Sequence, residues 1–186
     1  MISPKPPANN VPMDAQEFTK LVQRHAGLIH KIAYAYCRDA TDREDVIQEV
    51  ALQLWRSRHR YDQRYKETTW IYRIALNVAI SFYRRERRHR EGRLSIDPHA
   101  ITIAAESAGP GERVELLLYC IDDLGALDKA LVLLYLDGID HASIAAVLGI
   151  SVSNVGTKLL RLKNKLRLAF EQRERANESG GSHAVR

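Results

Sequence analysis

The stretch Thr41–Arg93, TDREDVIQEVALQLWRSRHRYDQRYKETTWIYRIALNVAISFYRRERRHREGR, decides the fold of the N-terminal half of the chain. Apolar residues recur three and four positions apart on both sides of a polar segment, which predicts two helices joined by a loop. Thr41 and Glu44 have the spacing of a capping box, so the first helix is expected to begin at Thr41. Its buried face is predicted to consist of Val46, Ile47, Val50 and Leu54.

The opposite face of this first helix combines acidic groups with large apolar side chains. At about 100° per residue, this face holds Asp45, Gln48, Glu49 and Arg56, with Leu52 among them and Trp55 at its edge. An exposed leucine and a tryptophan beside acids indicate a docking patch for another macromolecule.

The second helix is expected to begin near Thr68 or Thr69, either of which could cap it, and to end near Glu91. Its buried stripe is predicted to be Ile71, Ile74, Ala75, Val78 and Phe82. The other side is predicted to carry Trp70, Arg73, Asn77, Ser81, Arg84 and Arg88. Guanidinium groups neutralise phosphates and an aromatic ring stacks on unpaired bases, so this face suits nucleic acid. The preceding loop, residues 60–69, is either a solvated connection or part of the same contact.

Composition and charge favour two small all-α domains. The chain has 186 residues, 45% hydrophobic and 27% charged, with a net charge of +5. We expect a disordered leader at 1–12, a helical domain at 13–92, a linker at 93–110, a second helical domain at 111–174 and a disordered tail at 175–186. Acidic residues dominate 94–140 and basic residues dominate 158–175, so only part of the molecule is expected to face a polyanion.

Several classes of site are not predicted. Cys37 and Cys120 lie far apart in apolar helical contexts and are expected to be buried free thiols. His25 is interpreted as a packed imidazole and His30 as a surface one, so no metal ion and no cofactor are predicted. No apolar run reaches the length of about 18 residues that spans a bilayer, and no signal peptide is evident, so a cytoplasmic protein is expected.

The remaining helices follow from capping signals and apolar spacing. Asp14 and Glu17 form a second capping box, which predicts a helix from Asp14 to about Arg38. In the second domain, Glu112–Leu124 has helical spacing. Ala126–Leu136 is nearly all apolar and is expected to be buried on most sides, ending at Gly138.

Residues 140–170, DHASIAAVLGISVSNVGTKLLRLKNKLRLAF, follow a helix-turn-helix pattern. Gly149 permits the tight turn, and Ser153 is expected to cap the second helix. The inner side of that helix is predicted to be Val155, Leu159, Leu162, Leu166 and Phe170. Its outer side is predicted to be Asn154, Thr157, Lys158, Arg161 and Lys165. Such a face offers amide and cationic groups to the major groove, although a helical hairpin with a solvated basic face has the same pattern.

In this order, EDVIQEVALQLWR, TTWIYRIALNVAISFYRR and the helix-turn-helix resemble the extracytoplasmic-function group of bacterial sigma factors, over residues 14–172. The resemblance implies a promoter-specificity subunit, not an enzyme, that binds RNA polymerase core and promoter DNA. It assigns contact with the β′ clamp helices to Asp45, Gln48, Glu49, Leu52 and Trp55. It assigns the melted upstream promoter element to Arg64, Lys66, Thr69, Trp70, Arg73, Asn77 and Arg84. It assigns the more distant element to Ser153, Asn154, Thr157, Lys158, Arg161 and Lys165.

The resemblance also implies a possible anti-sigma partner, no small-molecule substrate and no stable membrane insertion. Three positions depart from the family pattern: Leu76 stands where many relatives have Arg, Ser81 where many have Asp, and Gly156 where a basic residue is common. A free-standing regulator whose N-terminal domain dimerises or senses a ligand is the alternative, and self-association would distinguish it. A nucleic-acid enzyme is a third reading, for which the sequence offers no catalytic motif.

Overall fold

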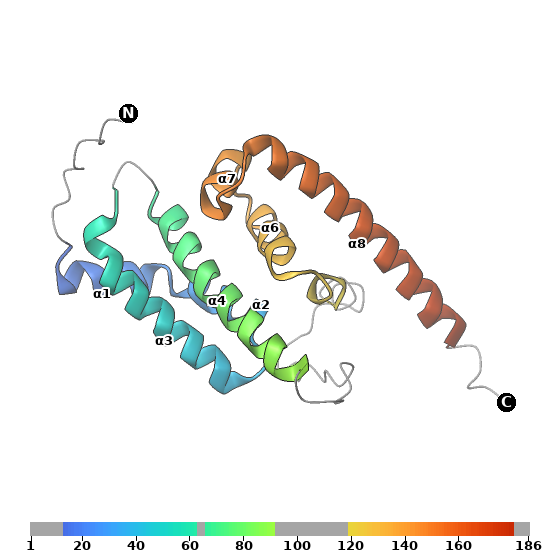
Figure 1. The fold of residues 1–186 in the computed structure, drawn as a ribbon, viewed down its shortest axis with the longest axis horizontal. Helices are drawn as coiled ribbons and strands as arrows, with labels where there is room; N and C mark the ends of the chain where they lie inside the picture. The colour runs from blue at the N-terminus through green and yellow to red at the C-terminus, as the bar shows by residue number, and fades with distance from the viewer. Residues whose placement is uncertain (1–12, 63–65, 92–118, 181–186) are drawn as a thin grey trace. The chain divides into compact units, whose positions relative to one another are not determined.

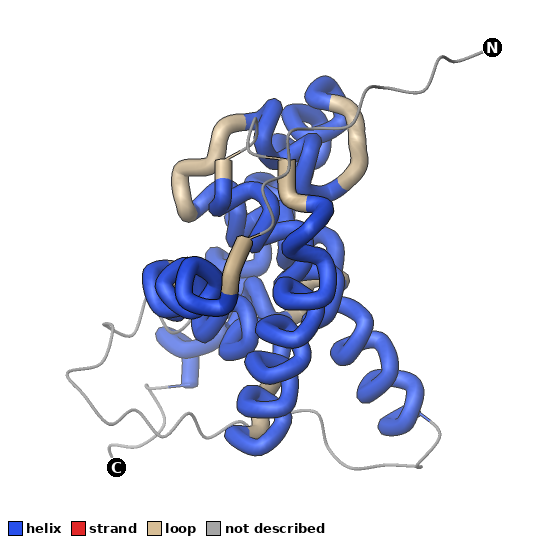
Figure 2. Tube along the Cα trace, turned by 90° about the vertical axis from the view of Figure 1, so that its left-hand side faces the viewer, coloured by secondary structure: helices blue, strands red, loops and turns tan. Residues whose placement is uncertain are grey.

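The computed structural model describes residues 13–62, 66–91 and 119–180, and the regular elements in these ranges are all helices (Figures 1 and 2). The all-α prediction is therefore confirmed. Two compact units divide the chain, residues 1–88 and residues 89–186. The predicted leader and the predicted linker lie outside the described residues, so the exact domain boundaries stay predictions.

The N-terminal unit contains four α-helices and one turn of 3₁₀ helix in its described part. They are α1 (Ala15–Arg24), α2 (Ala26–Tyr36), α3 (Ala40–Ser57), η1 (Arg58–Arg60) and α4 (Glu67–Glu91). The prediction of one continuous helix from Asp14 to Arg38 was wrong, because His25 leaves the helical conformation at φ −109° and ψ 13°. At the break, the His25 ring lies towards Glu67. The residue at the break is neither proline nor glycine, so no local signal in the sequence marks it.

In the N-terminal unit, one predicted helix start is confirmed and two are wrong. The Asp14–Glu17 capping box is confirmed, with the Glu17 N–H donating to Asp14 Oδ1 at 2.8 Å. The Thr41 cap was wrong: α3 is capped by Asp39, whose carboxylate accepts the Thr41 N–H at 2.7 Å. Helix α4 likewise begins before the predicted threonine caps, because the Lys66 carbonyl already accepts the Thr69 N–H.

The core of the N-terminal unit lies between α2, α3 and α4. Val46, Val50 and Leu54 of α3 are buried as predicted, while Ile47 is half-buried. On α4 the predicted stripe was too narrow and partly misplaced. Ile74, Val78 and Phe82 are only half-buried, whereas the buried residues are Ile71, Tyr72, Ala75, Leu76, Ala79 and Ile80. The wider buried face follows from contacts with more than one helix, including an edge contact between the rings of Tyr36 and Tyr83.

The C-terminal unit is a helical bundle around α6 (Ala126–Leu136), α7 (His141–Leu148) and α8 (Val152–Gly180), which contact one another in all three pairs. Residues 119–122 are also helical and are tied to α6 by an ion pair of 2.6 Å between Lys129 and Asp122. Leu131, Leu134, Ile144 and Val155 are fully buried. Leu127 and Leu136 are exposed, so α6 is less enclosed than its sequence predicts.

Helix α8 is longer than expected. It continues to Gly180, so the predicted disordered tail was wrong for residues 175–180, and residues 181–186 lie outside the described part. Arg173, just before this extension, forms an ion pair of 2.6 Å with Asp123. Within the described ranges, no single helix is long and apolar enough to cross a membrane, and α7 with part of α8 passes such a test only as a pair bent by 99°.

Candidate functional site

The outward face of α3 forms the predicted patch. The side chains of Asp45, Gln48 and Glu49 are exposed, and Leu52 among them is 40% exposed. We call these four residues the α3 patch. They belong to a helix held by Val46, Val50 and Leu54, so the patch is presented by a rigid element with an apolar centre and an acidic rim.

Trp55 packs within the unit, unlike the other residues of the predicted docking patch. Its ring makes an edge contact with Phe18 of α1 at a centroid distance of 5.0 Å. The guanidinium of Arg58 lies 3.6 Å from the centroid of the same ring. Trp55 is therefore half-buried and packed within the unit, and we leave it out of the α3 patch.

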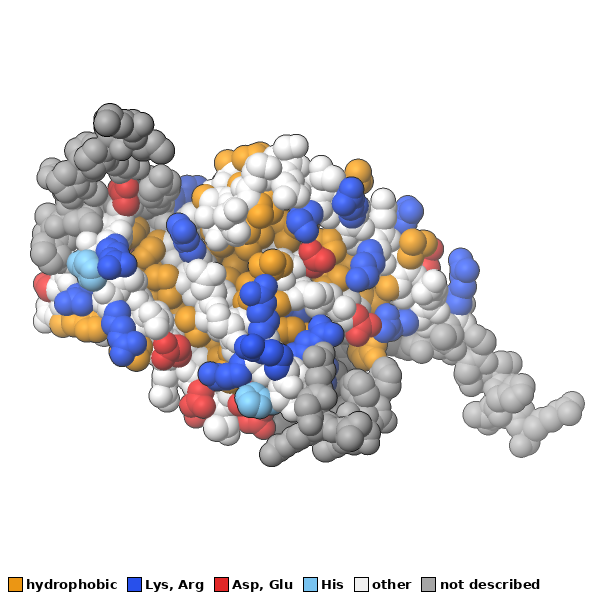
Figure 3. All heavy atoms as spheres, in the orientation of Figure 1, with side chains coloured by type: hydrophobic (Ala, Val, Ile, Leu, Met, Phe, Trp, Pro, Cys, Tyr) orange, Lys and Arg blue, Asp and Glu red, His pale blue; other side chains and the backbone are white. Residues whose placement is uncertain are grey.

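The outward face of α4 presents the predicted polar groups. Arg73, Asn77 and Arg84 are exposed at intervals of about one and two turns, and Figure 3 shows cationic side chains gathered over the C-terminal half of this helix. Leu76 is 2% exposed and belongs to the core. Ser81 is exposed on the same side as Asn77.

Trp70 lies at the first turns of α4 and is half-buried. Its ring packs on Tyr61 at a centroid distance of 4.9 Å and a tilt of 32°, so the two ends of the connecting segment are held together. Burial raises the pKa of Tyr61, and the carboxylates of Glu67 and Asp62 raise it further. Lys66 is exposed and Thr69 half-buried beside this pair, while the predicted contact residue Arg64 lies outside the described residues.

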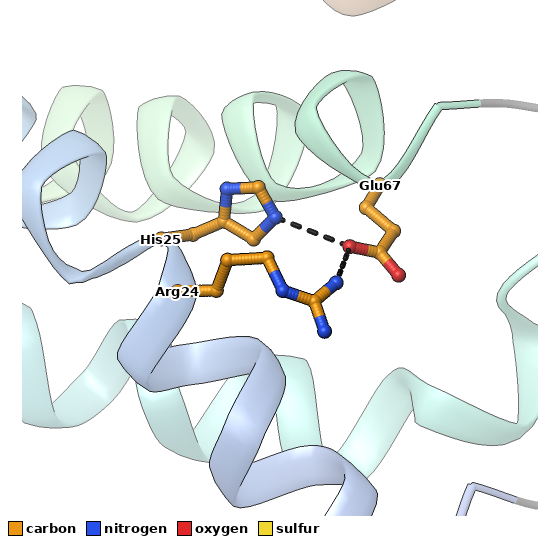
Figure 4. Close-up of polar contacts among 3 residues, drawn as sticks. All are labelled: Arg24, His25 and Glu67. Carbon is orange, nitrogen blue, oxygen red and sulfur yellow. Dashed lines mark hydrogen bonds and ion pairs between the residues drawn. The ribbon is translucent and has the colours of Figure 1, made fainter.

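The start of α4 is fixed by a cluster that the sequence did not reveal. Glu67 Oε2 accepts a hydrogen bond from Arg24 Nη1 at 2.8 Å and lies 3.2 Å from His25 Nε2 (Figure 4). Arg24 ends α1 and His25 stands at the break before α2, so one carboxylate joins three helices. The cluster holds the helix end that carries Thr69 and Trp70.

The second unit contains a helix-turn-helix at α7 and α8. Asp140 caps α7 by accepting the Ser143 N–H at 2.8 Å, and Gly149 makes the turn at φ +68°, as predicted for this glycine. Ser153 does not cap α8: the cap is Ser151, whose hydroxyl accepts the Asn154 N–H at 3.2 Å. Ser153, two residues later, is instead exposed near the start of the helix.

The outer face of α8 carries most of the residues that were predicted to contact DNA. Ser153, Asn154, Thr157, Arg161 and Lys165 are exposed, whereas Val155, Leu159 and Leu162 are buried. Lys158 is half-buried and pairs with Asp128 of α6 at 3.7 Å, so part of its charge is directed into the unit. The predicted inner residues Leu166 and Phe170 are half-buried.

The two cysteines are buried free thiols, as predicted. Burial raises the pKa of Cys37 to about 11, with Asp42 adding to the shift and Arg43 opposing it. His25 is half-buried and His30 is exposed, in agreement with their interpretation. In the described part of the chain, no group of three or more His, Cys, Asp or Glu side chains is arranged to hold a metal ion.

Two family models match this arrangement. The model described as Sigma-70 region 2 matches residues 21–89, and the model described as Sigma-70, region 4 matches residues 114–166. Together they cover more than half of the chain. The chain belongs to the sigma-70 family of RNA polymerase sigma factors.

Curated relatives agree with this family. The sigma factor is 28% identical over 155 residues to the ECF RNA polymerase sigma factor SigE of Mycolicibacterium smegmatis, a match that covers 80% of this chain and 59% of the relative. It is 29% identical over 160 residues to the RNA polymerase sigma factor CnrH of Cupriavidus metallidurans, covering 80% of this chain and 84% of the relative. The sigma factor thus spans less than two thirds of the length of the first of these proteins.

Solved structures share the fold. The sigma factor RpoE of Bartonella quintana, in complex with the anti-sigma factor NepR, matches with a TM-score of 0.70 and 15% identity, over 84% of this chain and 98% of that one. CnrH in complex with the cytosolic domain of CnrY matches with a TM-score of 0.62 and 23% identity, over 86% of this chain and 90% of that one. At these identities the likeness shows the fold alone.

Proposed function

We propose that this sigma factor binds RNA polymerase core, directs it to promoters and helps to separate the promoter strands. The observation that carries the proposal is the α3 patch: an exposed leucine is rimmed by exposed acids on a helix whose other face is buried. Such a patch fits a protein surface with an apolar spot and cationic surroundings. We assign it to the clamp helices of the β′ subunit.

The assignments on α4 and α8 divide the DNA between the two units. Lys66, Thr69, Trp70, Arg73, Asn77 and Arg84 are assigned to the melted upstream element, together with Arg64. Ser153, Asn154, Thr157, Lys158, Arg161 and Lys165 are assigned to the more distant element. Exposed amide and guanidinium groups on one helix face support both assignments.

Strand separation in this proposal needs no catalytic residue. Stacking an extruded base on an aromatic ring contributes roughly 1–3 kcal/mol, which is comparable to the cost of unstacking that base. Two modest DNA contacts joined through one chain and held on the polymerase also act together, because tethering raises the effective concentration of the second site. The chain would therefore be a regulatory subunit that acts in the cytoplasm with the polymerase.

We further propose that a protein antagonist can hold this sigma factor, since RpoE of Bartonella quintana is bound by an anti-sigma factor and shares the fold. The exposed apolar centre of the α3 patch is a surface that such an antagonist could cover. Competition between the antagonist and polymerase core would follow from a shared site.

Transcription in vitro with purified core and a pool of random promoters tests the function. The proposal expects that adding the full chain yields transcripts from a restricted set of templates that core alone does not use. Sedimentation at micromolar concentration should show a monomer without core. A stable dimer that binds duplex DNA but does not bind core would favour the free-standing regulator instead.

A further inference from the structure

Leu160 stands on the outer face of α8 and belongs to no predicted contact. Its side chain is 64% exposed, whereas its neighbours Leu159 and Leu162 are 4% and 5% exposed. Leu160 and Arg161 follow Thr157 by three and four residues, so both lie beside it on the same side of the helix. An apolar side chain thus adjoins the polar groups that the proposed function assigns to the distant promoter element.

The lysines on the flanks of α8 do not cover this leucine. Lys163 reaches α6, where its ammonium donates to the Tyr135 hydroxyl at 2.8 Å. Lys158 also points to α6 through its ion pair with Asp128 at 3.7 Å. Figure 3 shows the cationic side chains along α8 with hydrophobic surface between them.

Gly156 leaves space next to Leu160. Side chains on a helix lean towards its N-terminus, so the isopropyl group of Leu160 lies over the turn that contains Gly156. A Cβ built at Gly156 would meet no atom within 4 Å, so open space surrounds this position. The absent side chain therefore leaves open the side of Leu160 that faces Gly156.

The position of Leu160 along α8 indicates the kind of partner that it contacts. Leu160 follows the first residue of α8 by eight positions, about 12 Å at the rise of an α-helix, which is comparable to the width of the major groove. Leu168 is also exposed but lies about 24 Å from that end, beyond the part of a recognition helix that reads base edges. In the major groove, the 5-methyl group of thymine is the apolar feature that distinguishes one base from the others.

We propose that Leu160, in the space left by Gly156, reads the 5-methyl group of a thymine in the distant promoter element. The inference rests on the proposed function and adds a specificity-determining residue to it. Leu160 selects thymine by excluding water from the methyl group, while Arg161 and Asn154 supply polar contacts.

Replacement of thymine by uracil tests this directly, because it removes one methyl group and leaves base pairing intact. The probe is a promoter duplex recovered from the random pool, bound to the holoenzyme made from the full chain and core. Each thymine of the distant element is replaced in turn. We expect one replacement to weaken binding about fourfold, the effect of burying one methyl-sized group.

The variants show whether Leu160 is responsible. With Leu160→Ala the same replacement should have no effect, whereas the matched control Leu168→Ala should keep the fourfold loss. A Leu160→Ala holoenzyme that remains fully sensitive to the methyl group, or a wild type insensitive at every thymine, would overturn the inference while promoter selection itself stands. Failure of the chain to bind core or to select any promoter would instead overturn the proposed function, and the inference with it.

Discussion

Replacing Glu67 with glutamine should destabilise the N-terminal unit by about 1 kcal/mol. The change keeps the size of the side chain and removes the charge that faces Arg24 and His25. Arg24 is 61% exposed and Glu67 35% exposed, so their ion pair is screened by solvent and contributes about 0.2–1 kcal/mol. A carboxylate in the first turn of a helix adds about 0.3–1 kcal/mol through the helix dipole.

Tryptophan fluorescence during urea or thermal unfolding measures this loss. Both tryptophans, Trp55 and Trp70, lie in the N-terminal unit, so the signal reports on that unit alone. A loss of 1 kcal/mol corresponds to a decrease in Tm of roughly 4–8 °C for a domain of this size. The difference should shrink in 1 M salt, where the Debye length falls to about 3 Å.

Glu44→Gln is the matched control. Glu44 is an exposed acid on α3, and α3 is capped by Asp39. Its replacement should change the free energy of unfolding by less than about 0.5 kcal/mol. An unchanged unfolding midpoint for Glu67→Gln at low salt, or an equal loss in Glu44→Gln, would refute the view that Glu67 fastens the start of α4.

Three further outcomes are expected. Gly156→Ala should stabilise the C-terminal unit by about 1 kcal/mol in urea unfolding followed by circular dichroism, because the position is helical and a Cβ there meets no atom within 4 Å; a loss of stability would contradict this. Arg161→Ala should cost about 1–3 kcal/mol in holoenzyme binding at particular base pairs, and a uniform loss across all sequences would identify a phosphate contact instead. Burial raises the pKa of Cys37 from 9.0 to about 11, so the neutral thiol contributes fully to stability below pH 9, and this contribution is lost as the pH rises towards 11. Cys37→Ala should therefore reduce the fall in the free energy of unfolding between pH 8 and pH 10. An unchanged fall would argue against the buried thiol.

Local signals in the sequence predicted most of the described helices and the exposed face of α3. The Asp14–Glu17 capping box and the turn at Gly149 depend on residues close in sequence, and both were predicted correctly. The spacing of residues failed to identify the helix cap where two nearby residues could each have served as the cap. Asp39 and Ser151 each lie two residues before the predicted caps Thr41 and Ser153, and spacing alone does not decide which residue leaves the helical conformation.

Tertiary contacts account for the other differences. The pairing of Glu67 with Arg24 and His25 joins positions more than 40 residues apart, and no periodicity announces it. The same holds for Trp55, which has the composition of an exposed patch residue but packs on Phe18. Leu76 was absent from the predicted buried stripe of α4 but is buried in the core.

Binding of RNA polymerase core by the α3 patch is tested most directly by measuring the equilibrium binding of the full chain to core. The Leu52→Ser variant is compared with Leu136→Ser. Leu52 belongs to the α3 patch and Leu136 is an exposed leucine of the other unit, so neither change should unfold the protein. Burying a leucine side chain contributes roughly 1.5–3 kcal/mol, so Leu52→Ser is predicted to weaken binding about 10- to 100-fold while Leu136→Ser binds as wild type. Wild-type protein that does not bind core, or a Leu52→Ser variant that binds as tightly as wild type, would contradict the account.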